Sequence, residues 1–474
     1  MKKEKLEEAL NEISDKHIHE AAKAKKKKKG LRRLGLIAAI LALVLVGKYI
    51  EIPLVITAKA VSRSSGPQTP QRPYSISQFI NEDGYDKAWD QWRAANKILS
   101  ADLDTTIPQL EGFMTESCRE FLSGTGENLL YSPINAYIGL AMAAELASGN
   151  SRQQLLDALG VTDTDTLRQQ IHCLWESVYQ DDGNEICTLA NSLWLDKQLG
   201  YTQSVMDDLA YHYYTDIYQR NLHGFGAARD IGNWLASNTG GALKGNSIRV
   251  QLPEDPILAL YSTIYFQAKW QEEFNAANNT DDIFHGTAGD TRCTFMNFKL
   301  RQMHYYWGDS YGAVSLSLKN GSRMWFILPD EGKTTDDVLR EGQYWDMISH
   351  TGYSEEQSNC KYVKVNLSVP KFDISAQADL KDGLKNMGIT DIFSFKTADF
   401  SDSLEGPVCI TGANQSVRVA IDEKGVTAAA YIEFPGAGAA PPPDEIIDFI
   451  LDRPFLFVIT NSGIPLFAGT VNQP

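Results

Sequence analysis

Hydrophobic and polar residues near the carboxyl end of the chain alternate as they do in a β-strand, although the surrounding composition is that of a loop. Every second residue from Val426 to Phe434 is apolar, and Thr427, Tyr431 and Glu433 lie between them. Residues 435–443 are all Pro, Gly or Ala, a run that breaks strands and is open to proteases. The pattern predicts a segment that can be a loop in one state and a buried strand in another.

Strands are predicted on both sides of this segment. Residues 417–421 precede it, and two apolar runs, 449–459 and 464–471, follow it with a turn between them. Across residues 105–474, strand-like and helix-like patterns alternate irregularly, and no tract of Pro, Gly or Ser separates two halves. The pattern predicts one domain of mixed α and β structure.

The amino-terminal part of the chain has a different character. Residues 1–33 carry 12 Lys and Arg against 6 Asp and Glu, although the whole chain has a net charge of −16. Residues 34–46 are almost wholly apolar, and a helix over 34–58 would be long enough to cross a hydrocarbon core of roughly 30 Å. Because basic residues stay in the cytoplasm, we predict a cytoplasmic tail, a single-pass transmembrane anchor in the cell membrane, and an extracellular remainder.

A second interpretation of this apolar segment stays open. Ala58-Lys59-Ala60 fits the small-x-small pattern of an export signal, and the protein would be secreted if it were cleaved near Ala60. We favour the anchor because the apolar run ends well before that bond. Residues 59–104 are then an extracellular linker or membrane-proximal segment, with Pro, Gly and Ser early and Trp89 and Trp92 at near-helical spacing later.

The segment around the predicted switch resembles the serpin family. Inhibitory serpins carry a hinge close to E-x-G-T-x-A-A-A, a protease-cleaved loop, and then D-R-P-F-L-F; this chain has E-K-G-V-T-A-A-A at 423–430 and D-R-P-F-L-F at 452–457. The hinge departs at Val426, where Thr is more usual. Further family-like motifs follow in the family's order: N-L-L-Y-S-P at 128–133, G-N-S-R-Q-Q-L at 149–155, A-N-S-L-W at 190–194, N-W at 233–234, I-Y-F-Q-A-K-W at 264–270, P-K-F at 370–372 and G-I-T-D-I-F at 388–393.

The resemblance implies a fold and a mechanism. The fold is a serpin-like α+β domain over 105–474, with several helices, a large mixed central sheet A, smaller sheets B and C, and an exposed reactive-centre loop at 423–445. The implied activity is suicide-substrate inhibition, in which a serine protease forms an acyl-enzyme with the loop and the freed hinge inserts into sheet A. The hinge residues are Glu423, Gly425, Val426, Thr427, Ala428, Ala429 and Ala430. Because insertion would bury position 426, Val426→Asp is expected to turn the inhibitor into a substrate.

The reactive bond follows from the family's loop length. Counting forward from Glu423 places it at Ala439, and counting back from Phe449 places it at Ala440. Both residues are small, which fits elastase-like or subtilisin-like proteases better than trypsin-like ones.

The family's polar cluster in the opening sheet is altered in this chain. The corresponding residues are Ser132, Asn135, Ser262 and Gln415, and Trp270 is retained at the top of the same sheet. All four polar residues can form hydrogen bonds and could still latch the closed sheet. The alternative is a sheet that does not open, in a non-inhibitory serpin that acts as a surface binding or carrier module.

Signatures of other functions are missing from the sequence. There is no GxSxG, HExxH or P-loop motif, and the eight histidines have no metal-ligand spacing. We therefore expect no enzyme activity, no cofactor and no metal site. The expected partners of this monomer are a serine protease, in a covalent acyl complex, and the membrane through the amino-terminal helix, with no nucleic acid. Six scattered cysteines leave free thiols, which we favour, and disulfides both open.

Overall fold

The computed structural model describes residues 56–70, 73, 82–124, 126–181, 186–239, 250, 252, 256–349, 359–426 and 443–474. These residues belong to one folded unit, Ile56–Pro474. The predicted cytoplasmic tail, 1–33, and most of the predicted anchor, 34–58, lie outside the described residues. Within the described ranges, no helix has both the length and the apolar character needed to cross a membrane. The anchor therefore stays a prediction.

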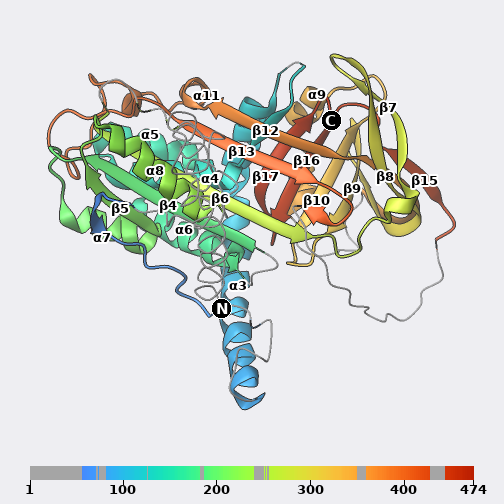
Figure 1. Ribbon diagram of the computed structural model, residues 1–474, viewed down its shortest axis with the longest axis horizontal. Coiled ribbons are helices and arrows are strands. Elements are labelled where there is room, and N and C mark those ends of the chain that lie inside the picture. Colours follow the sequence, from blue (N-terminus) through green and yellow to red (C-terminus); the bar gives the residue numbers. More distant parts are fainter. Residues whose placement is uncertain are drawn as a thin grey trace, which may run out of the picture. The chain divides into compact units, whose positions relative to one another are not determined.

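The first sheet has eight strands and corresponds to the predicted sheet A (Figure 1). Its order is β1 (Lys59–Ser62), β5 (Thr215–Arg220), β4 (Ile186–Asp196), β6 (Leu258–Lys269), β14 (Gly425–Val426), β13 (Asn414–Ile421) and β12 (Phe372–Asp379), with β3 (Gln180–Asp181) paired to β4. The sheet is mixed because β4 and β5 are parallel, whereas the other paired strands are antiparallel.

Five helices gather around this sheet in Figure 1: α4 (Pro133–Leu146), α5 (Gly149–Leu159), α6 (Thr164–Val178), α7 (Gln203–His212) and α8 (Phe225–Asn238). Helix α4 contacts both β6 of this sheet and β17 of the second one. All its residues except Gly139 are buried, which explains why its sequence is mostly apolar on every side and lacks an amphipathic stripe. Helix α6 begins with a conventional cap, in which Asp163 accepts a hydrogen bond from the Thr166 N–H.

The second sheet has nine strands and is also mixed. Its order is β15 (Ile446–Ile450), β11 (Cys360–Pro370), β8 (Gly289–Trp307), β9 (Tyr311–Ser317), β10 (Arg323–Pro329), β16 (Phe455–Asn461), β17 (Ile464–Val471) and β2 (Leu129–Tyr131), with β7 (Thr280–Gly286) paired to β8. Two smaller sheets, B and C, were expected. The described strands form one continuous sheet instead, because the 19-residue strand β8 pairs with β7, β11 and β9 in succession.

The remaining helices are short, apart from α3 (Glu82–Leu122). They are α9 (Thr335–Glu341), α10 (Tyr344–Ser349), α11 (Lys381–Asn386) and the 3₁₀ turns η3 (Ala276–Asn278) and η4 (Asp391–Phe393). All six cysteines are free thiols in the structure.

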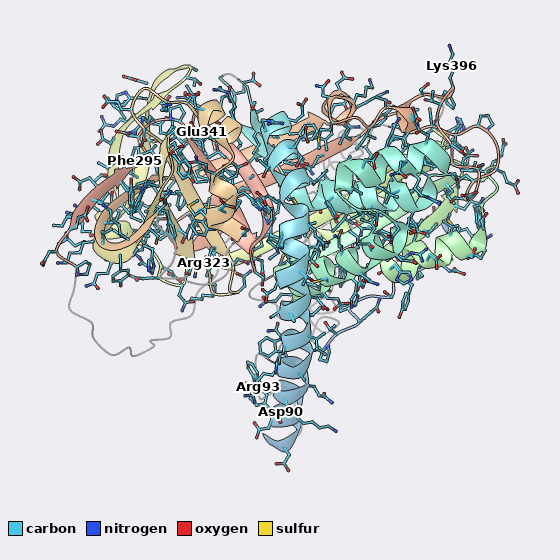
Figure 2. The ribbon with its side chains drawn as sticks, turned by 180° about the vertical axis from the view of Figure 1, so that it is seen from behind. Asp90, Arg93, Phe295, Arg323, Glu341 and Lys396 are labelled. Carbon is cyan, nitrogen blue, oxygen red and sulfur yellow. The ribbon has the colours of Figure 1, made fainter. Side chains whose placement is uncertain are left out.

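Helix α3 crosses a predicted domain boundary. The expected start of the domain at residue 105 falls inside this 41-residue helix. Its carboxyl-terminal half is anchored by buried side chains such as Leu110, Phe113 and Met114. Figure 2 shows its other end, with Asp90 and Arg93, projecting away from both sheets. There the rings of Trp89 and Trp92 are perpendicular, with centroids 5.1 Å apart, so the near-helical spacing of these residues reflects one continuous helix.

The start of the folded unit also differs from the predicted end of the anchor. The Thr57 N–H and hydroxyl both donate to Asp230 of α8 at 2.9 Å, and Ile56 and Ala58 pack against the apolar cluster under that helix. Strand β1 then pairs with β5. Residues 56–62 therefore belong to the fold, because their polar groups and side chains have partners on α8 and β5.

We expect Asp230→Ala to lower the unfolding free energy by about 3 kcal/mol, measured by urea denaturation. Asp230 is fully buried, pairs with Arg220 and holds Thr57, so its loss leaves a partly buried guanidinium without a carboxylate to balance its charge. Asp382→Ala serves as the control, because Asp382 is exposed and pairs with Lys385 at the surface. Equal midpoints for the two variants would contradict this assignment.

Candidate functional site

The first sheet contains two strands that are joined at one end by a third, very short strand. Strand β14 pairs antiparallel with β13, Val426 facing Ile421, and antiparallel with β6, Val426 facing Ala268. Strands β6 and β13 therefore run in the same direction. Among the described strands, β6 and β13 do not pair with each other, and the two residues of β14 are their only connection in the sheet. The sheet thus has two neighbouring edges whose backbone groups can accept another strand.

A tight turn holds β14 in place. The Asp422 carboxylate accepts hydrogen bonds from the N–H groups of Lys424 at 2.8 Å and Gly425 at 3.2 Å. Trp270, fully buried at the end of β6, donates its indole N–H to the Asp422 carbonyl at 2.8 Å. Its backbone N–H donates to the Lys424 carbonyl at 3.0 Å. The predicted sheet residue Trp270 therefore holds the hinge turn through two hydrogen bonds.

Gly425 is required by the close approach of β14 to β6. A Cβ at this position would lie 2.5 Å from the Ala268 carbonyl oxygen and 2.6 Å from the Lys269 Cα. Both neighbours are backbone, which cannot move aside without breaking the ladder. Of the other predicted hinge residues, Glu423 and Val426 are described, whereas Thr427, Ala428, Ala429 and Ala430 lie outside the described residues, as do Ala439 and Ala440.

The position of Val426 changes one expectation. Its side chain is already 97% buried in this structure, with 3% exposed. Val426→Asp would place a carboxylate in the core of the resting protein as well as in an inserted form. That variant cannot separate the two states, and a test of insertion needs a residue further along the segment.

Glu423 ties the turn to two neighbouring elements. Its carboxylate pairs with Lys371 at 2.5 Å and accepts a hydrogen bond from the Asn279 side chain at 2.6 Å. Its carbonyl accepts the Phe274 N–H at 2.9 Å. Burial raises the pKa of this carboxyl, but the hydrogen bonds from Lys371 and Asn279 outweigh it, so the pKa lies below its ordinary value. The ionised carboxylate is thus part of the closed structure.

The predicted polar cluster lies further along β6 and β13, away from β14, and consists of two hydrogen-bonded pairs. The side chain of Gln415 on β13 accepts the Ser132 N–H at 2.7 Å and donates to the Ser132 carbonyl at 2.9 Å. The Ser262 hydroxyl on β6 donates to the Asn135 side-chain oxygen at 3.3 Å. Ser132 immediately precedes α4 and Asn135 lies in its first turn. We call these four residues the latch, since they connect β6 and β13 through α4.

Ser132 also anchors the latch to the second sheet. Its hydroxyl donates to the Leu466 carbonyl at 2.7 Å, and Ser132, Asn135 and Gln415 are buried. Every bond of the latch is between uncharged groups, which can exchange partners without exposing a buried charge. A role of the latch in opening stays a prediction. Trp270 does not contribute to it, because Trp270 sits at the hinge end of β6.

Sequence reasoning missed three residues of the hinge turn: Asp422, Lys371 and Asn279. Lys371 belongs to the P-K-F motif that carries the family resemblance, yet its partner Glu423 is distant in the chain. Asp422 directly precedes the hinge, and an Asp before a Gly-containing turn is a recognisable signal. Asn279 has no such signal. No group of three or more His, Cys, Asp or Glu within the described ranges is arranged to hold a metal ion.

We expect Glu423→Gln to reduce stability at neutral pH by about 1–2 kcal/mol, the scale of a charge-assisted hydrogen bond. Because the folded pKa is depressed, this contribution is complete above the unfolded pKa of about 4.5 and is lost as the pH falls through the folded value. Urea midpoints of the two proteins, measured from pH 7 downward, should therefore converge in acid. A difference that stays constant below pH 4 would exclude the ionised carboxylate as its source.

Comparison with known proteins places this geometry in a family. The family model described as "Serpin (serine protease inhibitor)" matches residues 109–474. The alpha-1-antitrypsin-like protein GS55-MS of Ictidomys tridecemlineatus is 27% identical over 411 residues, which cover 84% of this chain and 94% of that protein.

Solved structures share the fold. The native state of the thermophilic serpin tengpin matches with a TM-score of 0.68 at 24% identity, covering 88% of this chain and 100% of the other. Thyroxine-binding globulin in complex with thyroxine matches with a TM-score of 0.59 at 23% identity, covering 80% and 99%. Since the family model covers residues 109–474, well over half of the chain and including the latch and the hinge turn, the chain belongs to the serpin family.

Proposed function

We propose that this protein inhibits serine proteases by inserting its cleaved reactive-centre loop between β6 and β13. The observation that carries the proposal is strand β14, which already lies between these two strands and is antiparallel to both. A segment that continued β14 beyond Val426 would find an unpaired edge on either side. The family's description as serine protease inhibitors supports the same conclusion.

The observed register indicates where an inserted segment would go. Val426 pairs with Ala268 on one side and Ile421 on the other, and each step of two residues moves both partners back by two. Ile432 would then lie opposite Ser262 and Gln415. Insertion would therefore reach the latch with the sixth residue added after Val426. The latch must rearrange before the strand passes it, and a latch made of neutral hydrogen bonds permits this.

The side chains of the predicted strand suit this gap. Ala428, Ala430, Ile432 and Phe434 would face the same side of the sheet as Val426, where Val417, Val419 and Ile421 are buried. Each inserted residue would gain ladder bonds, worth a net of about 0.5–1.5 kcal/mol apiece. Small residues first and larger ones later would let the strand enter without clashes. Tyr431 and Glu433 would face the other side.

The chemistry begins on the protease. Its serine would attack the carbonyl carbon of Ala439 or Ala440, the peptide C–N bond would break, and the new amine would leave with the carboxyl-terminal part of the loop. The amino-terminal part would remain as an acyl ester on the enzyme. Inhibition is then a competition between insertion and hydrolysis of that ester. The small residues at this bond favour elastase-like or subtilisin-like targets.

We also propose that the protein acts outside the cell, attached by the apolar segment before residue 56. The basic residues at 1–33 support this orientation. The position of Ala60 supports an uncleaved anchor, because Ala60 lies inside β1 and pairs with Tyr218 of β5. A cut after Ala60 would divide that strand and separate Thr57 from Asp230.

A non-inhibitory carrier or surface binding module is the second candidate. The latch supports this candidate, because the two hydrogen bonds from Gln415 to Ser132 tie β13 to the start of α4 and would oppose opening of the sheet. The fold alone does not distinguish the two functions, since thyroxine-binding globulin shares it. The two candidates differ in whether the sheet accepts the cleaved loop.

We expect incubation with elastase or subtilisin to produce a covalent adduct that survives boiling in detergent. Protein cleaved in the loop should also unfold at a temperature about 10 °C or more above that of intact protein, which corresponds to a few kcal/mol of added stability. Denaturing electrophoresis and calorimetry check the two results. A clean nick without an adduct, together with unchanged melting, would reject inhibition and favour the carrier.

We expect Ala430→Arg to be cleaved by the same protease without forming the adduct. In the extended register the arginine would have to be buried between Ile264 and Val417, which slows insertion relative to hydrolysis. Tyr431→Arg is the matched control, because the adjacent position would face outward and should keep the wild-type adduct yield. Equal yields from both variants would contradict insertion in this register.

A further inference from the structure

Four large apolar side chains are exposed together at one corner of the second sheet. They are half of the eight such side chains that are exposed in the described part of the chain, and 44–53% of each is accessible: Leu300 on β8, Tyr362 on β11, and Ile446 and Ile450 on β15. We call these four residues the apolar corner. Figure 1 shows β8 and β15 on the side of the molecule away from α5 and α7. A gathering of exposed apolar side chains marks an interaction surface.

The register of the strands puts these side chains on one face. Ile446 and Ile450 lie opposite Lys364 and Ser368 of β11, and Tyr362 precedes Lys364 by two residues. Residues two apart share a face of a strand. The side chains between them on β11 point the other way and are buried: Val363, Val365 and Leu367. The apolar corner is thus the open face of a sheet whose other face is packed.

A chain of hydrogen bonds connects the three strands across this face. The Asn366 side chain donates to Asp448 of β15 at 2.7 Å, and its oxygen accepts the Leu300 N–H of β8 at 3.0 Å. Leu300 is held at a φ of +50°, a conformation that is uncommon for a residue other than glycine. The exposed side chains are therefore carried by a fixed backbone, and a partner would meet a preformed surface.

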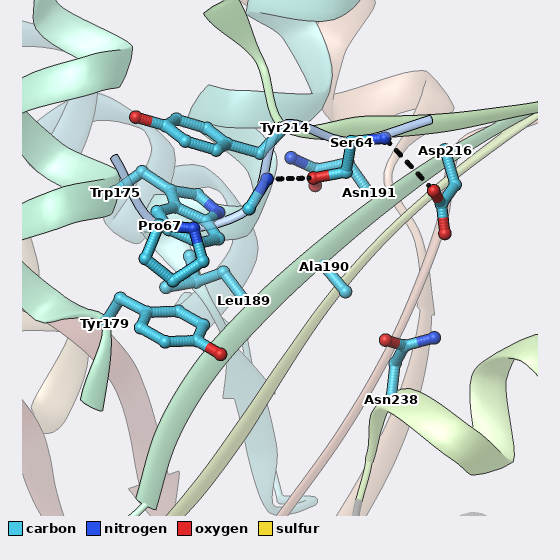
Figure 3. Close-up of a pocket in the computed structure, with 11 residues that line it drawn as sticks. Ser64, Pro67, Trp175, Tyr179, Leu189, Ala190, Asn191, Tyr214, Asp216 and Asn238 are labelled. Carbon is cyan, nitrogen blue, oxygen red and sulfur yellow. Dashed lines mark hydrogen bonds between the residues drawn. The ribbon is translucent and has the colours of Figure 1, made fainter. Parts of the chain in front are cut away.

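The corresponding edge of the first sheet is covered by the chain itself. Strand β1 pairs with β5 there, and Figure 3 shows Ser64 and Pro67, which follow β1, beside Trp175 and Asp216. The Ser64 N–H donates to Asp216 at 3.2 Å. By contrast, β15 is the last strand of its sheet, and no strand of the described part of the chain pairs with its outer edge. The apolar corner therefore lies at an open edge.

The apolar corner is close in the chain to the predicted reactive bond. Six residues lead from Ala440 to Ile446, a stretch that reaches about 20 Å when fully extended. A compact protease domain of about 200 residues is about 40 Å across. A protease that holds the bond in its cleft can therefore also contact the corner, with the surface beside that cleft.

The charges at this edge disfavour two other occupants. If two copies of β15 paired antiparallel in the fully overlapped register, their Asp448 side chains would face each other, and like charges directly opposite are destabilising. An anionic membrane surface would repel Asp444, Glu445 and Asp448, which are all exposed. A different protein is thus the occupant that the corner fits best.

We propose that the apolar corner is a docking surface for the target serine protease, separate from the reactive-centre loop. The proposal rests on the proposed inhibition, because it takes the protease as the partner. Contact with the corner would bury apolar area and stabilise the encounter between the two proteins. It would not contribute to insertion, which takes place between β6 and β13. The protease that fits carries an apolar surface beside the part of its cleft that holds the residues after the bond.

The test measures how fast elastase or subtilisin consumes the intact chain, with adduct and nicked product counted together on a denaturing gel. Tyr362→Ser combined with Leu300→Asn removes two side chains of the corner and leaves the sequence of the loop unchanged. Asn tolerates the positive φ at position 300. We expect the second-order rate constant to fall about threefold to tenfold with at least one of the two proteases.

Phe395→Ser is the matched control, because Phe395 is 58% exposed and lies far from the corner. In Figure 2 its neighbour Lys396 and Phe295 of β8 are at opposite ends of the molecule. This variant should keep the wild-type rate constant. Ile450→Ser changes the β15 side of the corner and should lower the rate constant in the same assay. Unfolding temperatures of the intact variants check that each is folded.

Equal rate constants for wild type, the double variant and Ile450→Ser with both proteases would overturn the proposal. A dimer of the chain that sedimentation detects and the double variant abolishes would do the same, since the corner would then bind a second copy. Inhibition is judged separately, from the fraction of consumed chain that becomes adduct. A chain that is only nicked can still show the docking effect, so the two proposals fail in different ways.

Discussion

Two parallel strands that are not hydrogen-bonded to each other along most of their described length dominate this structure. Strands β6 and β13 meet through the two residues of β14, and their facing edges otherwise lack a shared ladder. Backbone donors and acceptors at a strand edge are strongly driven to pair. The contacts at the hinge turn and at the latch hold these two edges in place.

The hinge contacts and the latch contacts differ in chemistry. At the hinge, Trp270, the ionised Glu423 and the side-chain-free Gly425 fix a turn whose geometry is set by close backbone approach. At the latch, Gln415 and Ser262 reach α4 through neutral hydrogen bonds. A charge-paired turn resists disruption, while neutral pairs exchange more readily. The hinge turn, where an inserted strand would start, is therefore held more strongly than the latch, which the strand would have to pass.

The amino-terminal segment has a different part in the fold from the one its composition indicates. Pro, Gly and Ser residues predict a spacer, yet residues 56–70 lie against the first sheet, with Thr57 bound to Asp230 and Thr69 bound to Glu176. Both acceptors are buried carboxylates on helices that appear much later in the chain. Composition describes how a segment behaves alone, and it carries no information about a distant acceptor that captures its backbone.

The sequence by itself determined the family, the mixed α and β class and the short list of polar residues at the sheet. Those features depend on local periodicity and on motifs in which neighbouring residues act together, such as E-K-G-V-T-A-A-A. Tertiary structure alone decided that Val426 is already buried, that Glu423 pairs with Lys371, and that the strands expected in two smaller sheets form one sheet. Each of these depends on which distant segments share a surface, and that is set by the packing of the whole unit.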